Sequence, residues 1–589
     1  MNFITLLEIN PVLSSIFGLF VIFVNYLYSF VFSCKYKIIN NYKLNFVFFN
    51  ILIYLTISVI LLFLLLLKTD ILHIKILFYL LFVLKIISVL FFYKNFTKEK
   101  FNFFNKYDYL ILIIFIIYCF SPISDADSLD YHLGGALEII KNQEFKPRTD
   151  EWHHFRLISL GEMINFYGLL FYSLNFGQLF QILAISNILI IFSILNSNYK
   201  INYLVLLSFP LFASLSLSAK QLLIISNCYL IVFSIILLKD KLLKYTIFAL
   251  LILTLAPLGF KHSYLIYSFP IWVVIYLYYK NDISLFKYLS LSSLIFLLIP
   301  FIFYFKNFIF YADPITPFLE FIKINPNLNI IDFASELRYS SKIFKIFEFP
   351  FIPIIHSLPF NLSEITLLTS PILFFSYYIV YKIKDNKLIL IYICLVFVLL
   401  FLSGKSQSRY FLDLYLLCTI IFLMNINHYK NKIISKFIII SMLPYALLTL
   451  LMIFYGVYSL SLPTLNKVKL TKNMNKKSHN YEIINWINSE VTSDDLVLYY
   501  KGIRSKSYQN HNFLFYNQSE FTLDDFKKIT KNNNVTKIVL TNGSSRELID
   551  SVKNCKYFEK KKFILRNTRN PFNKKNMDYI YLIDSRCIL

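Results

Sequence analysis

Long apolar runs separated by short polar connections occupy most of the chain. Residues 44–67 carry no charged side chain over a stretch longer than the ~20 residues that a membrane-spanning helix needs. Similar runs recur as far as residue 459. The pattern predicts about fourteen membrane helices, with both chain ends on the same side. They are expected near residues 11–33, 44–67, 71–93, 107–121, 178–196, 201–217, 221–238, 245–260, 263–279, 285–303, 364–381, 388–403, 411–427 and 437–459.

The distribution of charge between these runs predicts their orientation. Six connections are rich in lysine and are expected in the cytoplasm, because cytoplasmic loops carry an excess of Lys and Arg. They lie near residues 35–43, 94–106, 239–244, 280–287, 382–387 and 428–436. Residues 122–156 hold seven acidic and four basic side chains and are expected outside. This orientation requires the apolar stretch 157–174 to form a partial helix that does not cross the membrane.

Two long segments, 122–177 and 304–363, are therefore predicted to be external loops. From about Leu465 the pattern changes to short helical and strand-like stretches. Helices are expected at Tyr481–Glu490, Thr522–Lys531 and Ser544–Lys553, and strands at Leu496–Tyr500, Val535–Thr541 and Tyr579–Ile583. We predict an all-α polytopic membrane bundle with a small extracytoplasmic α/β domain. The expected divisions are 1–106, N-terminal membrane helices; 107–464, a catalytic membrane module; and 465–589, a water-exposed domain.

Composition supports the same class. Of 589 residues, 57% are hydrophobic, which excludes an ordinary soluble protein. Residues 1–10 contain no Lys or Arg, so the first apolar run is expected to be a membrane helix rather than a signal peptide. The chain's net charge is +24, and the basic tail favours anionic headgroups over nucleic acid as a partner. Cys555 and Cys587 could pair if the tail is extracytoplasmic.

The first external segment contains the strongest candidate motif, Ser124-Asp125-Ala126-Asp127-Ser128-Leu129-Asp130-Tyr131-His132-Leu133. It follows an expected helix and Pro122. Three carboxylates within six residues repel one another unless a cation or a solvated cleft relieves them. The pattern resembles the first external loop of bacterial GT-C glycosyltransferases, which include aminoarabinose transferases and protein mannosyltransferases. This resemblance implies that Asp127 lies at the catalytic centre, with Asp125 completing a D-x-D.

Three later stretches resemble the same family in the same order. In chain order they are Gly259-Phe260-Lys261, then Phe305-Lys306-Asn307 with Ala312-Asp313-Pro314-Ile315-Thr316-Pro317-Phe318, and last Gln407-Ser408-Arg409-Tyr410-Phe411. One departure stands at Ala219-Lys220-Gln221-Leu222, where family members often carry a second Asp. Either the metal-related role of that acid is absent here, or another acid such as Glu162 supplies it. In the family an acid such as Glu162 can contact a divalent metal ion, and His132 is a possible co-ligand.

The chemistry of transfer from a lipid phosphate gives these residues roles. A carboxylate among other acids suits a general base, so Asp127 is expected to deprotonate the acceptor hydroxyl. Arg409, Lys261 and Lys306 are expected to bind the phosphate that leaves. A planar guanidinium matches phosphate best, which favours Arg409.

The sequence therefore predicts an inverting glycosyltransferase of the cytoplasmic membrane. Its expected partners are a polyprenyl-phosphate sugar donor, a lipid, glycan or protein acceptor, and the membrane, with a divalent metal ion as an optional cofactor. Three alternatives stay open. One is an O-antigen ligase or polymerase using Arg338 and His356 of the second loop. Another is a transporter or flippase for lipid-linked sugars, which the 11 glycines and the external acids disfavour. The third is a non-catalytic relative that keeps the fold.

Overall fold

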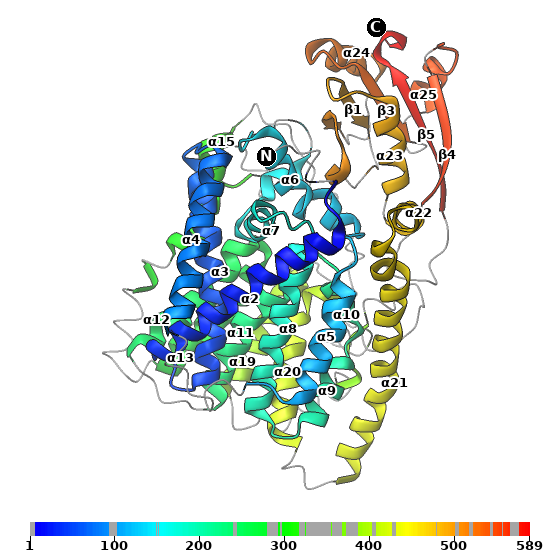
Figure 1. Cartoon of the computed structure of the whole chain (residues 1–589). Helices are drawn as coiled ribbons and strands as arrows, with labels where there is room; N and C mark the ends of the chain where they lie inside the picture. The colour runs from blue at the N-terminus through cyan, green and yellow to red at the C-terminus, as the bar shows by residue number, and fades with distance from the viewer. Residues whose placement is uncertain are drawn as a thin grey trace.

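The architecture comes from a computed structural model of the chain. It describes residues 8–92, 103–148, 152–238, 244–279, 297–316, 387–402, 408–426, 432–478, 480–500, 506–516, 522–541, 546–556, 558–565 and 576–588, with short pieces between these ranges. A bundle of helices forms the body of the molecule, and a smaller domain containing the strands stands on one end of it (Figure 1).

The first three membrane helices follow their apolar runs closely. They are α2 (Pro11–Lys35), α3 (Tyr42–Leu66) and α4 (Ile71–Phe92). Asn10 and Asn41 begin α2 and α3 by accepting hydrogen bonds from first-turn N–H groups, which have no partner inside a helix. Both α3 and α4 pack on α2. The predictions for these helices agree with the structure to within two residues.

The segment that carries the acidic motif lies between two long helices. It runs from α5 (Lys106–Cys119) through α6 (Gly134–Asn142) and α7 (Leu160–Leu170) to α8 (Phe176–Leu195). All of α7 is buried, and its 11 residues rise about 16 Å. This is well short of the ~30 Å hydrocarbon core of a bilayer. A partial helix in place of a full crossing therefore agrees with the sequence expectation.

Two of the later helices differ from their predictions. The run 201–217 is not one helix but two, α9 (Tyr199–Leu207) and α10 (Pro210–Ser216). Pro210 explains the break, because proline lacks the N–H that would continue α9. The end of the predicted helix 285–303 also differs: α15 (Leu298–Tyr311) continues past the expected start of the second external loop at 304, while most of residues 285–296 lies outside the described ranges. Most of that loop, and most of the helix expected at 364–381, lies outside the described residues.

The remaining bundle helices agree with their apolar runs. They are α11 (Leu222–Leu237), α12 (Lys244–Phe260), α13 (Leu265–Tyr279), α19 (Lys387–Leu402), α20 (Leu412–Asn425) and α21 (Lys432–Gly456). In the described part of the chain, six helices are long and apolar enough to cross a membrane, and four apolar helices are shorter. The polytopic bundle is thus present, but the count of about fourteen spans is not confirmed.

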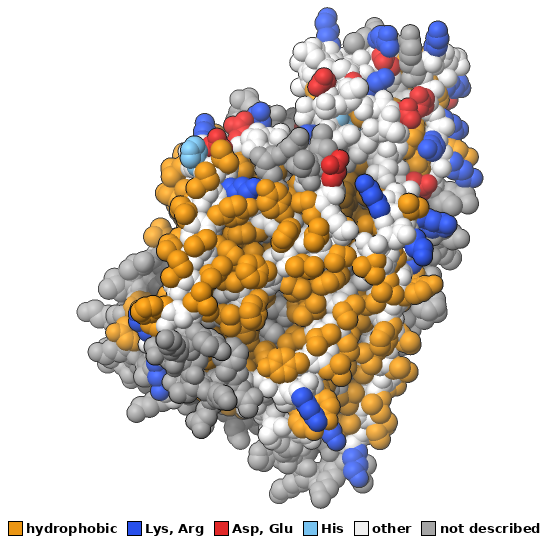
Figure 2. Space-filling model, viewed as in Figure 1, with side chains coloured by type: hydrophobic (Ala, Val, Ile, Leu, Met, Phe, Trp, Pro, Cys, Tyr) orange, Lys and Arg blue, Asp and Glu red, His pale blue; other side chains and the backbone are white. Residues whose placement is uncertain are grey.

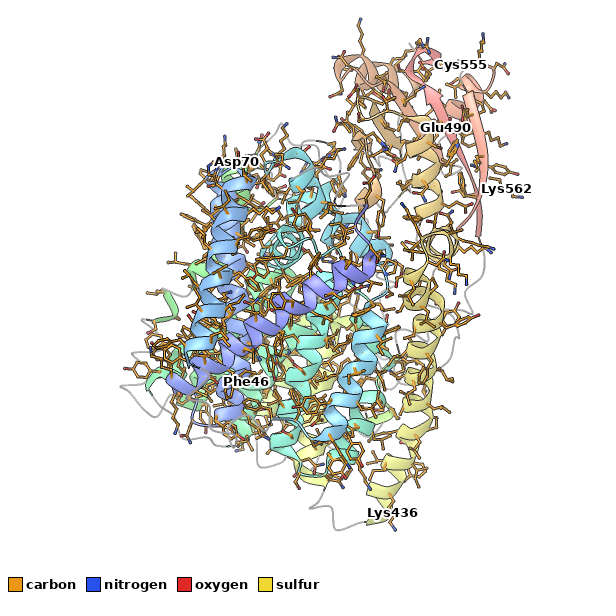
Figure 3. The ribbon with its side chains drawn as sticks, in the orientation of Figure 1. Phe46, Asp70, Lys436, Glu490, Cys555 and Lys562 are labelled. Atoms are coloured by element: carbon orange, nitrogen blue, oxygen red, sulfur yellow. A yellow bond between two sulfur atoms is a disulfide. The ribbon has the colours of Figure 1, made fainter. Side chains whose placement is uncertain are left out.

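The bundle has two ends of different character. Its visible sides are covered by hydrophobic side chains; Lys or Arg side chains are the charged ones in view at one end, whereas basic and acidic side chains are both seen at the other (Figure 2). Asp70, which precedes α4, lies at the end that carries the small domain, and Lys436 lies at the opposite end (Figure 3). We call these the domain end and the lysine end. The segment with the acidic motif is at the domain end.

The small domain contains one five-stranded sheet with the order β2-β1-β3-β5-β4. Its strands are β1 (Leu496–Tyr500), β2 (Asn512–Tyr516), β3 (Lys537–Thr541), β4 (Phe558–Leu565) and β5 (Asn576–Asp584). The first three are parallel, and β5 is antiparallel to β3 and β4. Its helices are α22 (Lys467–Lys477), α23 (Tyr481–Glu490), α24 (Leu523–Asn532) and α25 (Arg546–Val552). The predicted elements are present, whereas β2, β4 and α22 were not expected.

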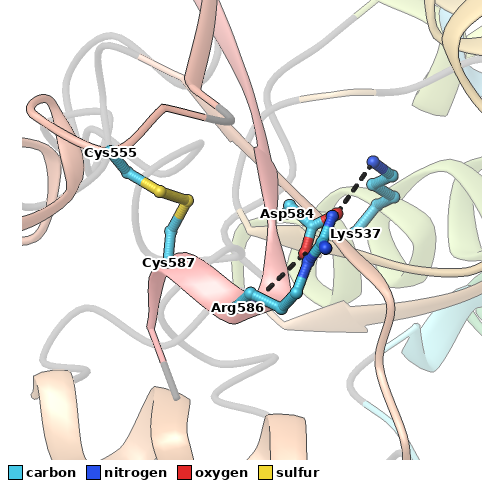
Figure 4. The surroundings of a disulfide bond; sticks show 5 residues. All are labelled: Lys537, Cys555, Asp584, Arg586 and Cys587. Atoms are coloured by element: carbon cyan, nitrogen blue, oxygen red, sulfur yellow. Dashed lines mark hydrogen bonds and ion pairs between the residues drawn. A yellow bond between two sulfur atoms is a disulfide. The ribbon is translucent and has the colours of Figure 1, made fainter.

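A disulfide closes the end of this domain. Cys555 and Cys587 are bonded, as their position in the tail had suggested. Asp584 lies close by, where its carboxylate pairs with Arg586 and Lys537 (Figure 4). These pairs hold the pKa of Asp584 well below its usual range, chiefly through the hydrogen bond from Arg586. Together they fasten the chain terminus to β3 and β5.

Candidate active site

The acidic motif folds into an irregular helical turn. Asp125 accepts a hydrogen bond of 3.0 Å from the backbone N–H of Ser128, and this contact starts the π-helix η3 (Ser128–His132). Asp127 is the residue that immediately precedes η3. Single turns of π-helix occur frequently at functional sites. The local fold therefore holds Asp127 at the start of a rigid turn at the domain end of the bundle.

Two cations contact the Asp127 carboxylate. Lys220 places its ammonium 2.6 Å from Oδ2, and the Arg409 guanidinium lies 3.1 Å from the same oxygen. Lys220 is also 3.7 Å from Asp125. Asp127 was expected to lie among acids, whereas its Oδ2 contacts two cations, from segments 93 and 282 residues away along the chain. It is thus held as one member of an ionic cluster.

The cluster has an open side and a closed side. The side chains of Asp127 and Arg409 remain 22% and 27% exposed, whereas that of Lys220 is only 7% exposed. A ligand that approaches from outside would therefore meet Arg409 and Asp127 first. Lys220 supports the cluster from within. It was noted in the sequence only as the place where an acid is missing, so its contact with Asp127 was not foreseen.

Lys261 joins the same cluster from the end of α12. It lines a pocket together with Arg409, Tyr410 and the apolar Leu222. The pKa of Lys261 is lowered to about 8, chiefly by burial; Tyr410 and Asp127 oppose this shift, and the positive charges of Arg409 and Lys220 add to it. Arg409 also lies 5.3 Å from the centre of the Tyr410 ring. The recess itself has a volume of only about 20 Å³, but its two cations offer charge-assisted hydrogen bonds to a phosphate, beside walls that are largely apolar.

Glu162 and His132 form a pair beneath this cluster. Glu162 Oε1 lies 2.7 Å from His132 Nδ1, and Oε2 accepts hydrogen bonds from the N–H and hydroxyl of Ser159. Burial lowers the pKa of His132 even though Glu162 opposes the shift. The carboxylate is thus engaged on both oxygens, as the cap of α7 and the partner of His132.

These contacts fit a metal poorly, because both oxygens of Glu162 already accept hydrogen bonds. In the part of the chain that the structure describes, no group of three or more His, Cys, Asp or Glu side chains is gathered as metal ligands would be. The use of Glu162 and His132 as ligands of a divalent ion stays a prediction.

Lys306 does not face the cluster. Its side chain is fully buried, and its ammonium donates to the backbone carbonyls of Arg156 and Ile158 at 2.7 Å each. Lys306 therefore fastens α15 to the segment that leads into α7. The structure brings together Asp125, Asp127, Arg409 and Lys261, and it assigns Lys306 a different contact from the one expected.

The small domain touches the acidic motif directly. Ser507, in the short helix η14 (Lys506–Tyr508), donates a hydrogen bond from its hydroxyl to the carbonyl of Leu129 in η3. Further along the same loop, Arg148 donates to the carbonyl of Phe513 at 2.7 Å, and the N–H of Phe515 donates to Asp150 at 2.9 Å. The side chains of Arg148 and Asp150 thereby satisfy backbone groups of β2, the strand at the edge of the sheet. The site loop and the small domain form one unit.

Fold and site define a polytopic membrane protein with a charged cluster at one end of its bundle. Residues 83–475 match the family described as "DUF1420 N-terminal domain", and the chain belongs to this family. The fold is similar to the crystal structure of ArnT from Cupriavidus metallidurans bound to undecaprenyl phosphate. The TM-score is 0.51 at 11% identity, with 81% of this chain and 97% of that chain covered. No curated protein matches the chain.

The expected resemblance to GT-C glycosyltransferases is thus confirmed at the level of the fold. The alternative of an O-antigen ligase rested on Arg338 and His356, and both lie outside the described residues.

Proposed function

We propose that the protein is a membrane glycosyltransferase that moves a sugar from a polyprenyl-phosphate donor to a lipid, glycan or protein acceptor. The observation that carries this proposal is the pocket at Arg409 and Lys261, which joins two cations and apolar walls directly beside the Asp127 carboxylate. The similarity in fold to ArnT bound to undecaprenyl phosphate supports the same class of ligand.

The proposed reaction is a direct displacement. The acceptor hydroxyl oxygen forms a bond to the anomeric carbon, and the bond from that carbon to the phosphate oxygen breaks. The polyprenyl phosphate leaves with the electron pair and the added negative charge, which Arg409 and Lys261 stabilise. The hydroxyl proton passes to Asp127. Displacement from the opposite face inverts the anomeric centre.

The ion pair between Arg409 and Asp127 gives donor binding a second role. A bound phosphate competes with Asp127 for the guanidinium, because both are anions that accept its hydrogen bonds. Donor binding would thereby release one cation from the carboxylate and leave Asp127 more basic. The site would then become competent to take a proton only when the donor is present.

The charge pattern supports an outward-facing site. Lys436, at the end of one expected cytoplasmic connection, lies at the lysine end, whereas the small domain and α6, which follows the acidic motif, lie at the other end. The disulfide between Cys555 and Cys587 fits an oxidising compartment. We therefore place the reaction at the outer face of the bacterial cytoplasmic membrane.

Lys220 favours a second candidate function. Where related enzymes often carry an acid, this chain places an ammonium 2.6 Å from the candidate base. A relative that binds polyprenyl phosphate without transferring a sugar would tolerate such a pairing. The two candidates share the binding site and differ in whether Asp127 acts as a base.

Binding of undecaprenyl phosphate to the purified full chain tests the site. Charge-assisted hydrogen bonds contribute about 1.5–3 kcal/mol, so Arg409→Ala should weaken binding about ten- to a hundredfold. Lys146→Ala is the matched control, because Lys146 is an exposed lysine of the loop that carries Asp127 and pairs with the exposed Glu144. Equal affinity of wild type and Arg409→Ala would remove the donor site from this pocket.

A further inference from the structure

A second cavity lies far from the ionic cluster, at the lysine end of the bundle. It has a volume of about 640 Å³ and is bordered by α2, α3 and α4. Its walls are predominantly apolar, with Phe32, Phe49, Ile53 and Leu81 among them. The volume lies within the range of ~300–1,000 Å³ that is usual for ligand sites. It shares no lining residue with the pocket at Arg409 and Lys261.

Two exposed lysines stand at the mouth of this cavity. Lys35 is the last residue of α2, and Lys37 follows it in the connection to α3. The Lys35 ammonium lies 5.3 Å from the centre of the Tyr36 ring and 5.6 Å from that of Phe92. These contacts keep the charge at the end of the helices, where lipid headgroups lie. The mouth is therefore complementary to an anion.

A third lysine lies deeper in the wall. Lys85 stands seven residues before the end of α4, about 10 Å along the helix axis. Among the described residues, the hydrogen-bond acceptor of its ammonium is Asn25 Oδ1, at 2.7 Å. An ammonium has three donors. An ionisable group at membrane depth is costly unless partners satisfy it, so a ligand in this cavity should supply further acceptors.

We infer that this cavity binds a glycerophospholipid with an anionic headgroup, drawn from the leaflet at the lysine end. Its phosphate would pair with Lys35 and Lys37, and one ester carbonyl would accept a hydrogen bond from Lys85. An acyl chain would follow α3 from Phe49 to Ile60, which is about 17 Å of helix and close to the depth of one leaflet.

The deep lysine distinguishes this occupant from other lipids of the membrane. A polyprenyl phosphate could satisfy the two lysines at the mouth, but its hydrocarbon chain offers no acceptor to Lys85. A neutral phospholipid offers the ester carbonyls without net charge at the headgroup. Of these three lipids, only an anionic glycerophospholipid offers both a negative headgroup to Lys35 and Lys37 and an ester carbonyl to Lys85. The inference does not depend on the proposed transferase activity, because the two pockets are separate.

Native mass spectrometry of the delipidated full chain, titrated with phosphatidylglycerol, tests the headgroup. Each lysine near the membrane surface is worth about tenfold or less in anionic lipid binding, so Lys35→Gln with Lys37→Gln should weaken binding about thirtyfold. Lys436→Gln is the matched control, an exposed lysine at the same end outside the cavity. Equal binding of phosphatidylcholine, equal binding by the double variant, or a loss of undecaprenyl phosphate binding in the double variant as large as its loss of phosphatidylglycerol binding would each overturn the proposal.

An ether-linked phosphatidylglycerol, which lacks the ester carbonyls, tests the contact with Lys85. Wild type should bind the ester lipid about tenfold more tightly than the ether lipid, and Lys85→Met should abolish that difference. An unchanged preference in Lys85→Met would refute the carbonyl contact. Leu52→Trp, which fills the cavity without altering charge, should displace both lipids. Persistent binding in that folded variant would show that the lipid lies elsewhere.

Discussion

The lowered pKa of Lys261 predicts how donor binding depends on pH. Lys261 binds phosphate only when protonated, and burial lowers its pKa to about 8. Its affinity contribution is therefore complete below pH 7 and is lost as the pH rises through 8. The protonated fraction is about 0.9 at pH 7 and about 0.1 at pH 9, which predicts about tenfold weaker binding across this range. A bound phosphate raises the pKa of Lys261 and so sustains the decline above pH 8.

The assay is the affinity of the full chain for undecaprenyl phosphate between pH 6.5 and 9.5. A phosphate monoester loses its second proton near pH 6, so the ligand's charge is almost constant above pH 7. Lys261→Arg should bind with a flat profile, because a guanidinium stays protonated throughout. Lys261→Met should bind weakly and also without a slope. A tenfold decline that persists in Lys261→Met would assign the titration to another group and refute this account of the pocket.

Three further predictions concern the base, the disulfide and the orientation. Asp127→Asn should reduce the rate of sugar transfer by a factor of about 10²–10⁴ and leave donor affinity within several-fold. Turnover and binding are measured on the same preparation, and an unchanged rate of transfer would favour the binding-only candidate. Cys555→Ser opens a link across 32 residues and should lower the free energy of unfolding of the small domain by about 3 kcal/mol, read from protease susceptibility of the full chain in urea; unchanged susceptibility would contradict the bond. The orientation is tested in a background in which the native exposed free cysteines are replaced by serine. There, Lys146→Cys should react with an impermeant thiol reagent in intact cells, and Lys436→Cys should not. The opposite pattern would invert the proposed topology.

Local patterns were sufficient to predict most of the bundle. Apolar runs as long as 44–67 leave helix as the natural spanning structure, because lipid cannot satisfy open backbone groups. The division of 201–217 was also readable in retrospect, since Pro210 lies inside that run. The late end of α15 was harder to predict. Its polar residues Lys306 and Asn307 suggest the start of a loop, whereas both are buried and bonded to backbone carbonyls.

The missed strand β4 has a plain physical reason. The Lys-rich run in β4 reads as a solvated loop, but an edge strand can expose such side chains while its backbone pairs with β5. The site itself was only half predictable. Asp127 and Arg409 stood out by residue type and motif order, but the contact with Lys220 joins distant segments, and no local periodicity encodes it. Lys306 matched the motif but contacts backbone carbonyls outside the cluster, because a motif match cannot reveal which way a buried side chain points.

The contact between the site loop and β2 also constrains how the protein is made. The loop residues Arg148 and Asp150 leave the ribosome more than 350 residues before their partners in β2. Until β2 has been made and has joined the sheet, the loop lacks its cover and the edge of the sheet does not yet exist. A chain that stops before β2 would therefore expose the ion pair of Arg148 and Asp150 that β2 otherwise covers. The order of synthesis therefore makes completion of this loop a late event, because it requires a chain that has been translated at least as far as β2.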